Sequence, residues 1–459
     1  MTPTRHRQIL LLLASYYFYM AWIPEFALLM AFTTIVNFYA AKEIDRTTVI
    51  ARRKFFLVSS LIINFGILFY FKYFNFFASS LSSILTREGE FQTLNIILPV
   101  GISFYTFQAL SYTIDVYRSQ SKSESSLIDF ALYVSFFPQL VAGPIERYEH
   151  LTSQLKTLNN PSTDDIKEGI KLIIWGFFKK VVIADRLAIY VNSVFNNVEA
   201  SNSISLVLAT YLFSIQIFCD FSGYTDIARG TARFFGIRLM DNFNRPYFAK
   251  SVSEFWGRWH ISLSTWFKDY VYIPLGGNKV SANRWFFNIS CVFILSGLWH
   301  GANWTFIVWG ALHAFYFLVE RFFSQSPLAD LKSNNFTTFL RILFTYHLVV
   351  FAWIFFRANS ISDATLIINK IFTMSDFSFG ALSAAILPFT SDNRAIAHLI
   401  TAILLIIFME VVHTLQEQKV KWFEESGNSR LAYISFSLLL VVTIFLGKFN
   451  ENSFIYFQF

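Results

Sequence analysis

Apolar residues run along this chain in stretches of helical length, separated by short polar segments, almost from end to end. A helix that crosses a membrane needs about 20 predominantly apolar residues. The stretches predict helices near residues 8–22, 26–41, 55–77, 94–116, 127–142, 166–196, 204–221, 285–299, 302–323, 336–356, 396–415 and 431–447. We expect roughly 9 to 12 crossings, with the remaining helices re-entrant or interfacial. The pattern predicts an all-α polytopic membrane protein with one membrane domain over residues 1–459.

The amino-acid composition supports this interpretation and excludes other classes of protein. Of the 459 residues, 54% are hydrophobic and 15% are charged, whereas soluble domains carry roughly 25% charge. The net charge of +7 does not indicate a nucleic-acid ligand, because the enrichment of Lys and Arg in cytoplasmic loops is enough to explain it. Cys219 and Cys291 are the two cysteines of the sequence, which excludes a disulfide framework and a cysteine metal site. Membrane lipids are the expected surroundings.

The distribution of basic residues predicts the orientation of the first helices. Arg5 and Arg7 precede the first apolar run, and the segment 42–54 after the second run is rich in Lys and Arg. Because such residues favour the cytoplasm, we expect both ends of this hairpin to be cytoplasmic. The loop 82–92 is then external, and the segment 118–122 is internal. The first run lacks a small-residue cleavage pattern, so we expect a retained helix.

Polar residues concentrate in a central block, residues 216–284, among many aromatic residues. They are Asp220, Asp226, Arg229, Arg233, Arg238, Asp241, Arg245, Lys250, Glu254, Arg258, His260, Lys268 and Asp269. This mixture predicts interfacial and re-entrant helices on the cytoplasmic side. Residues 253–269, taken as one helix, place His260 at the edge of an aromatic arc and Glu254 four residues before Arg258, where the two can pair. The alternative is an amphipathic helix lying on the surface.

A second histidine, His300, lies inside the apolar stretch 295–306. An ionisable residue at membrane depth is costly and indicates a functional site, although a hydrogen bond to a neighbouring helix would also explain it. His313 falls on what we expect to be a common helix with His300. The histidines other than His260 and His300 lack an aromatic, glycine-containing setting; they are His6, His150, His313, His347, His398 and His413.

The chemistry open to these histidines is limited. The sequence contains no Gly-x-Ser-x-Gly elbow, no cysteine nucleophile at motif spacing and no phosphate-binding glycine loop. Two widely spaced histidines are too few for a zinc site, so we expect no metal. A neutral buried imidazole is a good general base for a hydroxyl. Proton transfer at a hydroxyl, by an enzyme, and proton conduction, by a proton-coupled membrane transporter, both remain open.

Several segments resemble the membrane-bound O-acyltransferase (MBOAT) family, in its bacterial alginate O-acetyltransferase-like branch. They are residues 99–108, 137–145, 220–226, 242–247, 254–264, 272–277, 298–301 and 454–459. The segments follow one another in the family's order over most of the chain. One departure is Gly257, where the family pattern has a basic residue.

The resemblance implies a ring of helices around a central cavity, a catalytic core within residues 216–310, and a multi-pass protein of the bacterial inner membrane. It implies that His300 is the catalytic base and His260 the second active-site histidine. In a direct acyl transfer we expect His260, or a polar partner such as Asn303, to orient groups or to stabilise the oxyanion. Acetyl-CoA is the expected donor, with Arg245, Arg258 and Lys268 as candidate donor-binding residues. The expected acceptor is an extracytoplasmic polysaccharide, reached through an SGNH-type acetyltransferase partner. D-alanyl transfer to teichoic acid from a carrier protein is the alternative within the family.

Overall fold

A computed structural model describes residues 4–85, 93–324, 334–374, 376–385, 395–417, 430–449 and 454, and these contain helices and no strand. Contacts divide the chain into two compact units, which are residues 1–169 with 228–240, and residues 170–227 with 241–459. The single membrane domain expected from the sequence therefore stays a prediction. Parts of the loops 82–92 and 324–335, and of the 454–459 motif, lie outside the described residues.

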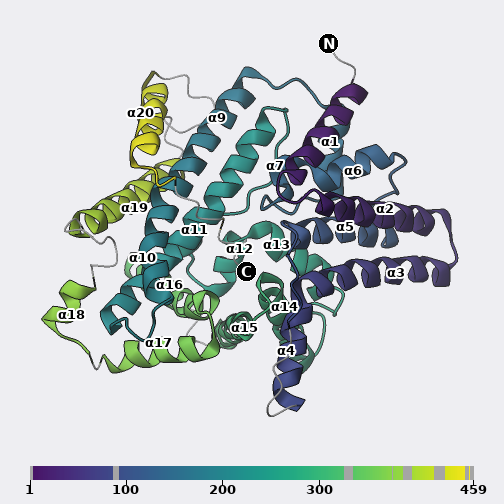
Figure 1. Ribbon diagram of the computed structural model, residues 1–459. Helices are drawn as coiled ribbons and strands as arrows, with labels where there is room; N and C mark the ends of the chain where they lie inside the picture. The colour runs from purple at the N-terminus through teal and green to yellow at the C-terminus, as the bar shows by residue number, and fades with distance from the viewer. Residues whose placement is uncertain are drawn as a thin grey trace. The chain divides into compact units, whose positions relative to one another are not determined.

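The first unit holds the N-terminal helices. They are α1 (Thr4–Met20), α2 (Glu25–Arg46), α3 (Ile50–Leu68), the π-helix η1 (Phe69–Tyr73), α4 (Phe74–Leu85), α5 (Ile102–Tyr117), α6 (Leu127–Ser135), α7 (Phe137–Leu140) and α8 (Tyr148–Thr157). Helices α2, α3 and α5 run side by side (Figure 1). A buried polar network joins them, in which the Asn37 side chain bonds those of Asn64, Ser60 and Thr113 over 2.9 to 3.0 Å.

Two long helices continue from one unit into the other. Helix α9 (Thr163–Phe177) begins in the first unit, and α11 (Ser203–Arg233) begins in the second. The second unit also contains η2 (Phe178–Ala184), α10 (Asp185–Phe195), η3 (Pro246–Phe248), α12 (Val252–Arg258), α13 (Ile261–Phe267), η4 (Lys268–Tyr272), α14 (Ala282–His300), α15 (Trp304–Ser324), α16 (Asn335–Arg357), α17 (Ile361–Thr373), α18 (Phe379–Ala384), α19 (Ala395–Glu417) and α20 (Arg430–Leu446).

Helices α14 and α15 form a close pair in the second unit (Figure 1). A Cβ added at Gly297 would lie 2.2 Å from the carbonyl oxygen of Phe306, and one at Gly310 would lie 2.3 Å from that of Phe293. The absence of side chains at these two positions lets the helix backbones approach closely, as small residues do in membrane helix pairs. This close packing fixes the end of α14, where His300 lies.

Within the described residues, six helical segments are long and apolar enough to cross a membrane. They are Glu25–Arg46, Ile50–Leu85, Ser203–Arg233, Trp304–Phe323, Asn335–Arg357 and Ile396–Leu415. The expected total of 9 to 12 crossings stays a prediction.

The helix predicted near residues 94–116 is shorter than expected. Helix α5 begins at Ile102 rather than near residue 94, because Pro99 and the left-handed Gly101 (φ 73°) precede it.

Candidate functional site

His260 lies at a sharp break between two short helices. The predicted continuous helix over residues 253–269 is wrong, because α12 ends at Arg258 and α13 begins at Ile261. Between them His260 adopts the left-handed conformation, with φ 43°. The Ile261 N–H donates to the Asn242 carbonyl oxygen (3.0 Å), and the Ser262 N–H donates to the Asn242 side-chain oxygen (3.1 Å). These bonds satisfy donors at the start of α13, which favours the break over a continuous helix.

The predicted pairing beside this break is present. Arg258 Nη2 lies 2.6 Å from Glu254 Oε1 on α12. The break turns His260 into the protein, and its side chain is fully buried. Burial lowers the pKa of His260 to about 3, because the charged imidazolium loses its hydration. His260 is therefore neutral at physiological pH.

His300 is the last residue of α14 and is 3% exposed. The expected common helix with His313 is wrong, because Gly301 is extended and α15 starts at Trp304. A Cβ at Gly301 would lie 2.1 Å from the Phe306 ring, so this ring closes over the turn. The turn places His300 on one helix of the close pair and His313 on the other.

The structure brings His260 and His300 together. Their ring centroids are 6.2 Å apart, and the ring planes are tilted by 53°. The Trp299 ring contacts both, at 5.9 Å from His260 and 5.1 Å from His300. The two histidines singled out in the sequence therefore lie in one buried cluster.

Aromatic rings enclose this pair. Phe221 of α11 lies 4.6 Å from His260 at 86°. On the other side, His300 contacts Trp309 at 5.1 Å and Phe356 at 5.3 Å. Such an enclosure excludes water, which strengthens any electrostatic interaction with a substrate held inside it.

His313, which the sequence interpretation set aside, belongs to the same aromatic cluster. It is fully buried, and its ring lies 4.9 Å from Trp309. Its Nδ1 accepts a hydrogen bond from the Trp256 indole N–H at 3.3 Å. The four-residue spacing from Trp309 to His313 places both on one face of α15, and that spacing is the sequence signal that would have found His313.

Two polar residues at the start of the central block lie in a long helix rather than in a short one. Asp220 and Asp226 belong to α11, one of the apolar segments long enough to span. Asp226 pairs with Lys179 at 2.6 Å, and Asp220 pairs with Lys180 at 2.8 Å. Buried charges persist in an apolar chain when they are paired. These pairs fasten η2 to α11 on either side of Phe221, which touches His260.

The three candidate donor-binding residues differ in their surroundings. Lys268 is the most exposed, with 60% of its side chain accessible and Asp269 3.9 Å away. Arg258 is 24% exposed and is engaged by Glu254. Arg245 is 12% exposed. Of the three, Lys268 is the most accessible to an anionic ligand.

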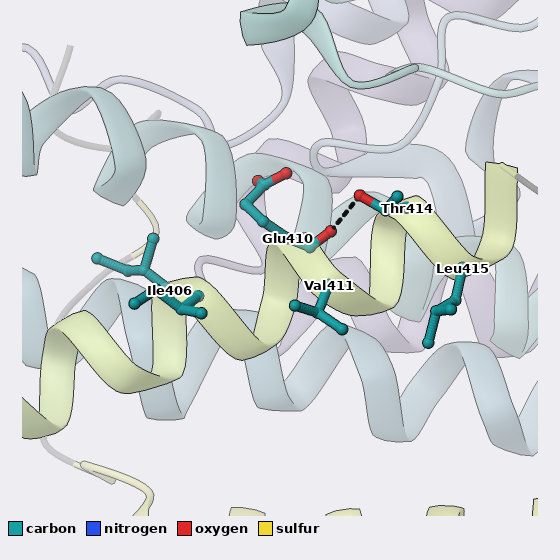
Figure 2. Close-up of a pocket in the computed structure, with 6 residues that line it drawn as sticks. Ile406, Glu410, Val411, Thr414 and Leu415 are labelled. Atoms are coloured by element: carbon teal, nitrogen blue, oxygen red, sulfur yellow. Dashed lines mark hydrogen bonds between the residues drawn. The ribbon is translucent and has the colours of Figure 1, made fainter.

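Arg245 faces α19 rather than solvent. Its Nη2 donates to Thr414 Oγ1 (3.1 Å) and lies 4.0 Å from Glu410 Oε2. Figure 2 shows Glu410 and Thr414 on α19, where the Thr414 hydroxyl donates to the Glu410 carbonyl oxygen at 2.8 Å. Both line an open, mainly apolar groove of about 370 Å³, together with Ile406, Ile407, Val411 and Leu415. Arg245 therefore contacts the polar part of this groove.

The side chain of Asn303 is engaged in hydrogen bonds with backbone groups. Its side-chain nitrogen donates to the Asn359 carbonyl oxygen (3.0 Å), and its side-chain oxygen accepts from the Thr305 N–H (3.1 Å). These bonds hold the start of α15.

Within the described ranges, no three His, Cys, Asp or Glu side chains form a group that would hold a metal ion.

Comparison with known proteins identifies the family of the chain. Residues 105–362 match MBOAT, the membrane-bound O-acyltransferase family. The "probable alginate O-acetylase AlgI" of Pseudomonas aeruginosa is 39% identical over 83% of this chain and 72% of its own length. The peptidoglycan O-acetyltransferase of Helicobacter pylori is 33% identical over 98% of this chain and 91% of its own length. The teichoic acid D-alanyltransferase of Bacillus subtilis is 31% identical over 58% of this chain and 70% of its own length.

The chain belongs to the membrane-bound O-acyltransferase family. It is an O-acyltransferase and a multi-pass bacterial membrane protein. The family expected from the sequence motifs is confirmed, and it favours an enzyme over the transporter. Both buried histidines of the site lie within the matched residues.

Proposed function

We propose that the protein moves acetyl groups from cytoplasmic acetyl-CoA toward an extracytoplasmic polysaccharide, with an SGNH-type acetyltransferase as its partner on the outer side. The observation that carries the proposal is the buried pair of His260 and His300 inside an aromatic enclosure. The names of the relatives support the acyl group and the acceptor class, since one denotes O-acetylation of alginate and another O-acetylation of peptidoglycan.

His300 is proposed as the general base. Its imidazole takes the proton from an acceptor hydroxyl as that oxygen attacks the carbonyl carbon of the thioester. The new C–O bond forms a tetrahedral intermediate, which collapses by breaking the C–S bond. The imidazolium then returns the proton to the departing thiolate, so the products are an ester and a thiol. No covalent enzyme intermediate is needed.

His260 is proposed as the second active-site histidine. It is neutral and fully buried, and its ring contacts His300. A neutral imidazole can donate from one nitrogen and accept at the other, which suits it to orient a reacting group beside the base. The pairs that hold α11 to η2 support this role, because they fix Phe221 against His260.

Lys268 is the best supported of the three donor-binding candidates. Its ammonium is accessible and can attract the phosphates of acetyl-CoA, whereas Arg258 and Arg245 are engaged by Glu254 and by residues of α19. Replacing Lys268 by Gln is expected to raise the KM for acetyl-CoA with little change in kcat. Lys279→Gln is the matched control, because it removes another cation of the same region.

D-alanyl transfer is the second candidate within the family. The D-alanyltransferase of Bacillus subtilis aligns with 58% of the chain, whereas the peptidoglycan O-acetyltransferase of Helicobacter pylori aligns with 98%. The more complete alignment favours O-acetylation. A carrier protein loaded with D-alanine, offered in place of acetyl-CoA, discriminates the two functions.

The direct experiment uses purified protein in lipid nanodiscs with acetyl-CoA and a hydroxyl-bearing oligosaccharide. Release of free coenzyme A thiol that depends on the acceptor, with mass spectrometry showing an added acetyl group, supports the proposal. Thiol release only from D-alanyl carrier protein would replace it with the D-alanyl alternative. Comparing surface polymers of cells with and without this protein then identifies the polymer that carries the acetyl group.

A further inference from the structure

Tryptophan indoles of the aromatic cluster differ in whether their N–H groups are used. The Trp256 N–H donates to His313 Nδ1 at 3.3 Å, and the Trp285 N–H donates to the Tyr272 hydroxyl at 2.9 Å. Trp309 is fully buried, and within the described residues its Nε1–H has no hydrogen-bond partner. A buried donor without a partner costs stability, and a phenylalanine would fill much of the same space without that cost.

The unused donor lies beside the proposed base. The Trp309 and His300 ring centroids are 5.1 Å apart at 88°. Trp353 stacks on Trp309 at 5.7 Å and 20°, and His313 contacts it at 4.9 Å. Packing on several sides holds the indole in one orientation, which is the condition for a preorganised hydrogen-bond donor.

We propose that the Trp309 Nε1–H donates a hydrogen bond to the thioester carbonyl oxygen and stabilises the oxyanion that forms when an acceptor hydroxyl attacks. This rests on the acyl transfer proposed above. As the C–O bond forms, the carbonyl π electrons move onto oxygen, and the proton of the hydroxyl goes to His300. The negative oxygen then accepts from the indole more strongly than the ground-state carbonyl does. Collapse of the intermediate re-forms the carbonyl and expels the thiolate.

Asn303, the amide suggested for this role by the sequence, is poorly suited to it. Both polar atoms of its side chain are engaged, with the Asn359 carbonyl oxygen and with the Thr305 N–H. Trp309 suits the role better than Asn303. Its ring contacts His300, and its indole N–H has no hydrogen-bond partner in the described part of the chain.

Two replacements at position 309 test the proposal. Trp309→Phe removes the N–H and part of the ring. Incorporating 3-benzothienylalanine instead of Trp309 exchanges the N–H for sulfur and keeps the bicyclic shape. Removing one oxyanion donor typically lowers kcat by about 10²–10³-fold. We expect a loss of this size in both variants, with the KM for the thioester changed less than threefold and the melting temperature of the benzothienyl protein close to that of the wild type.

Trp175→Phe is the matched control. Trp175 is also a buried tryptophan, but its ring packs on Phe178 and His413 rather than on Trp309, so we expect its kcat within about threefold of wild type. Wild-type kcat in the benzothienyl protein overturns the proposal, even if Trp309→Phe is inactive, because shape alone would then explain Trp309. The kinetic comparison at position 309 uses whichever thioester the wild-type enzyme consumes. If the wild type does not use acetyl-CoA, the proposed donor is wrong, but the role of Trp309 can still be measured with the thioester that it does use.

Discussion

The imidazole rings of His260 and His300 lie with their centroids 6.2 Å apart, although one histidine occupies a left-handed break between α12 and α13 and the other ends α14. Both are buried. The backbone geometry at each position is therefore part of the site: Asn242 caps the start of α13 beside His260, and Gly301 permits the turn that follows His300.

The buried, neutral state of His260 predicts a pH dependence of stability. The pKa of His260 is lowered to about 3, below an ordinary unfolded value of about 6.5. Between these values the unfolded chain binds a proton that the folded protein does not. His260 therefore does not affect the free energy of unfolding above about pH 6.5. Below that pH it lowers the free energy of unfolding by up to about 1.4 kcal/mol per pH unit.

His260→Asn measures this contribution. Asparagine tolerates the left-handed backbone and does not titrate. Melting temperatures in detergent between pH 7.5 and 5 should fall more steeply for the wild type than for the variant. Parallel pH curves for the two proteins would show that folding does not lower the pKa of His260.

Two glycines near the site predict opposite responses to alanine. A Cβ at Gly301 would lie 2.1 Å from the Phe306 ring, whereas a Cβ at Gly257 meets nothing within 4 Å. Gly301→Ala should lower stability by about 1–3 kcal/mol through overpacking and should impair activity by displacing His300. Gly257→Ala, on the helix α12, should raise stability by about 0.4–1 kcal/mol. Thermal unfolding checks both; equal effects at the two positions would contradict the packing around Gly301.

The open space at Gly257 also bears on the departure from the family pattern. Because no atom lies within 4 Å of a Cβ there, a basic side chain at this position would meet no steric obstacle at its first carbon. The departure therefore removes a side chain without reshaping α12.

The long apolar helices were predictable from the sequence, because contact with lipid or a packed interior selects apolar residues along their whole length. The stretches near 26–41, 336–356 and 396–415 correspond to α2, α16 and α19. Helices α8 and α17 were missed because charged residues interrupt them, including Glu149 and Lys156 in α8.

The site was predictable only in part. An ionisable residue in an apolar setting pointed to His300, and an aromatic setting pointed to His260. The break at His260 was not predictable, because its cause is a tertiary contact with Asn242. His313 was set aside because its setting in the sequence was not recognised as aromatic and glycine-containing. The helix expected to join it to His300 is interrupted at Gly301, where the Phe306 ring packs against the turn.

The Asn37 network predicts that polar contacts stabilise the first unit. Asn37→Leu removes bonds to Asn64, Ser60 and Thr113 at once. Hydrogen bonds between membrane helices average about 0.6 kcal/mol each, so we expect a loss of about 1–3 kcal/mol when the partners left behind are included. Thr113→Val loses one of these bonds and should cost less. Detergent melting curves that rank the two variants in the reverse order would contradict the central position of Asn37.

The orientation of the first hairpin is testable by cysteine labelling. The helical segment Ile50–Leu85 has 36 residues and is about 54 Å long at 1.5 Å per residue, more than the roughly 30 Å membrane core. With Cys219 and Cys291 replaced, a cysteine at Ser82 should react with an impermeant reagent added outside. One at Thr47 should react only after lysis, since Lys and Arg keep its loop in the cytoplasm. Labelling of both from outside would exclude this orientation.

The central claim, that His300 is the general base, is tested most directly by His300→Gln in purified form. Glutamine keeps hydrogen bonding but cannot accept the proton at neutral pH. His347→Gln is the control, since His347 lies on α16 against Tyr211 and should keep its activity within about threefold. The decisive measurement is the acceptor-dependent rate of acyl transfer by folded His300→Gln protein. We predict a rate at least about 10²-fold below wild type; a rate near wild type would show that His300 is not the base.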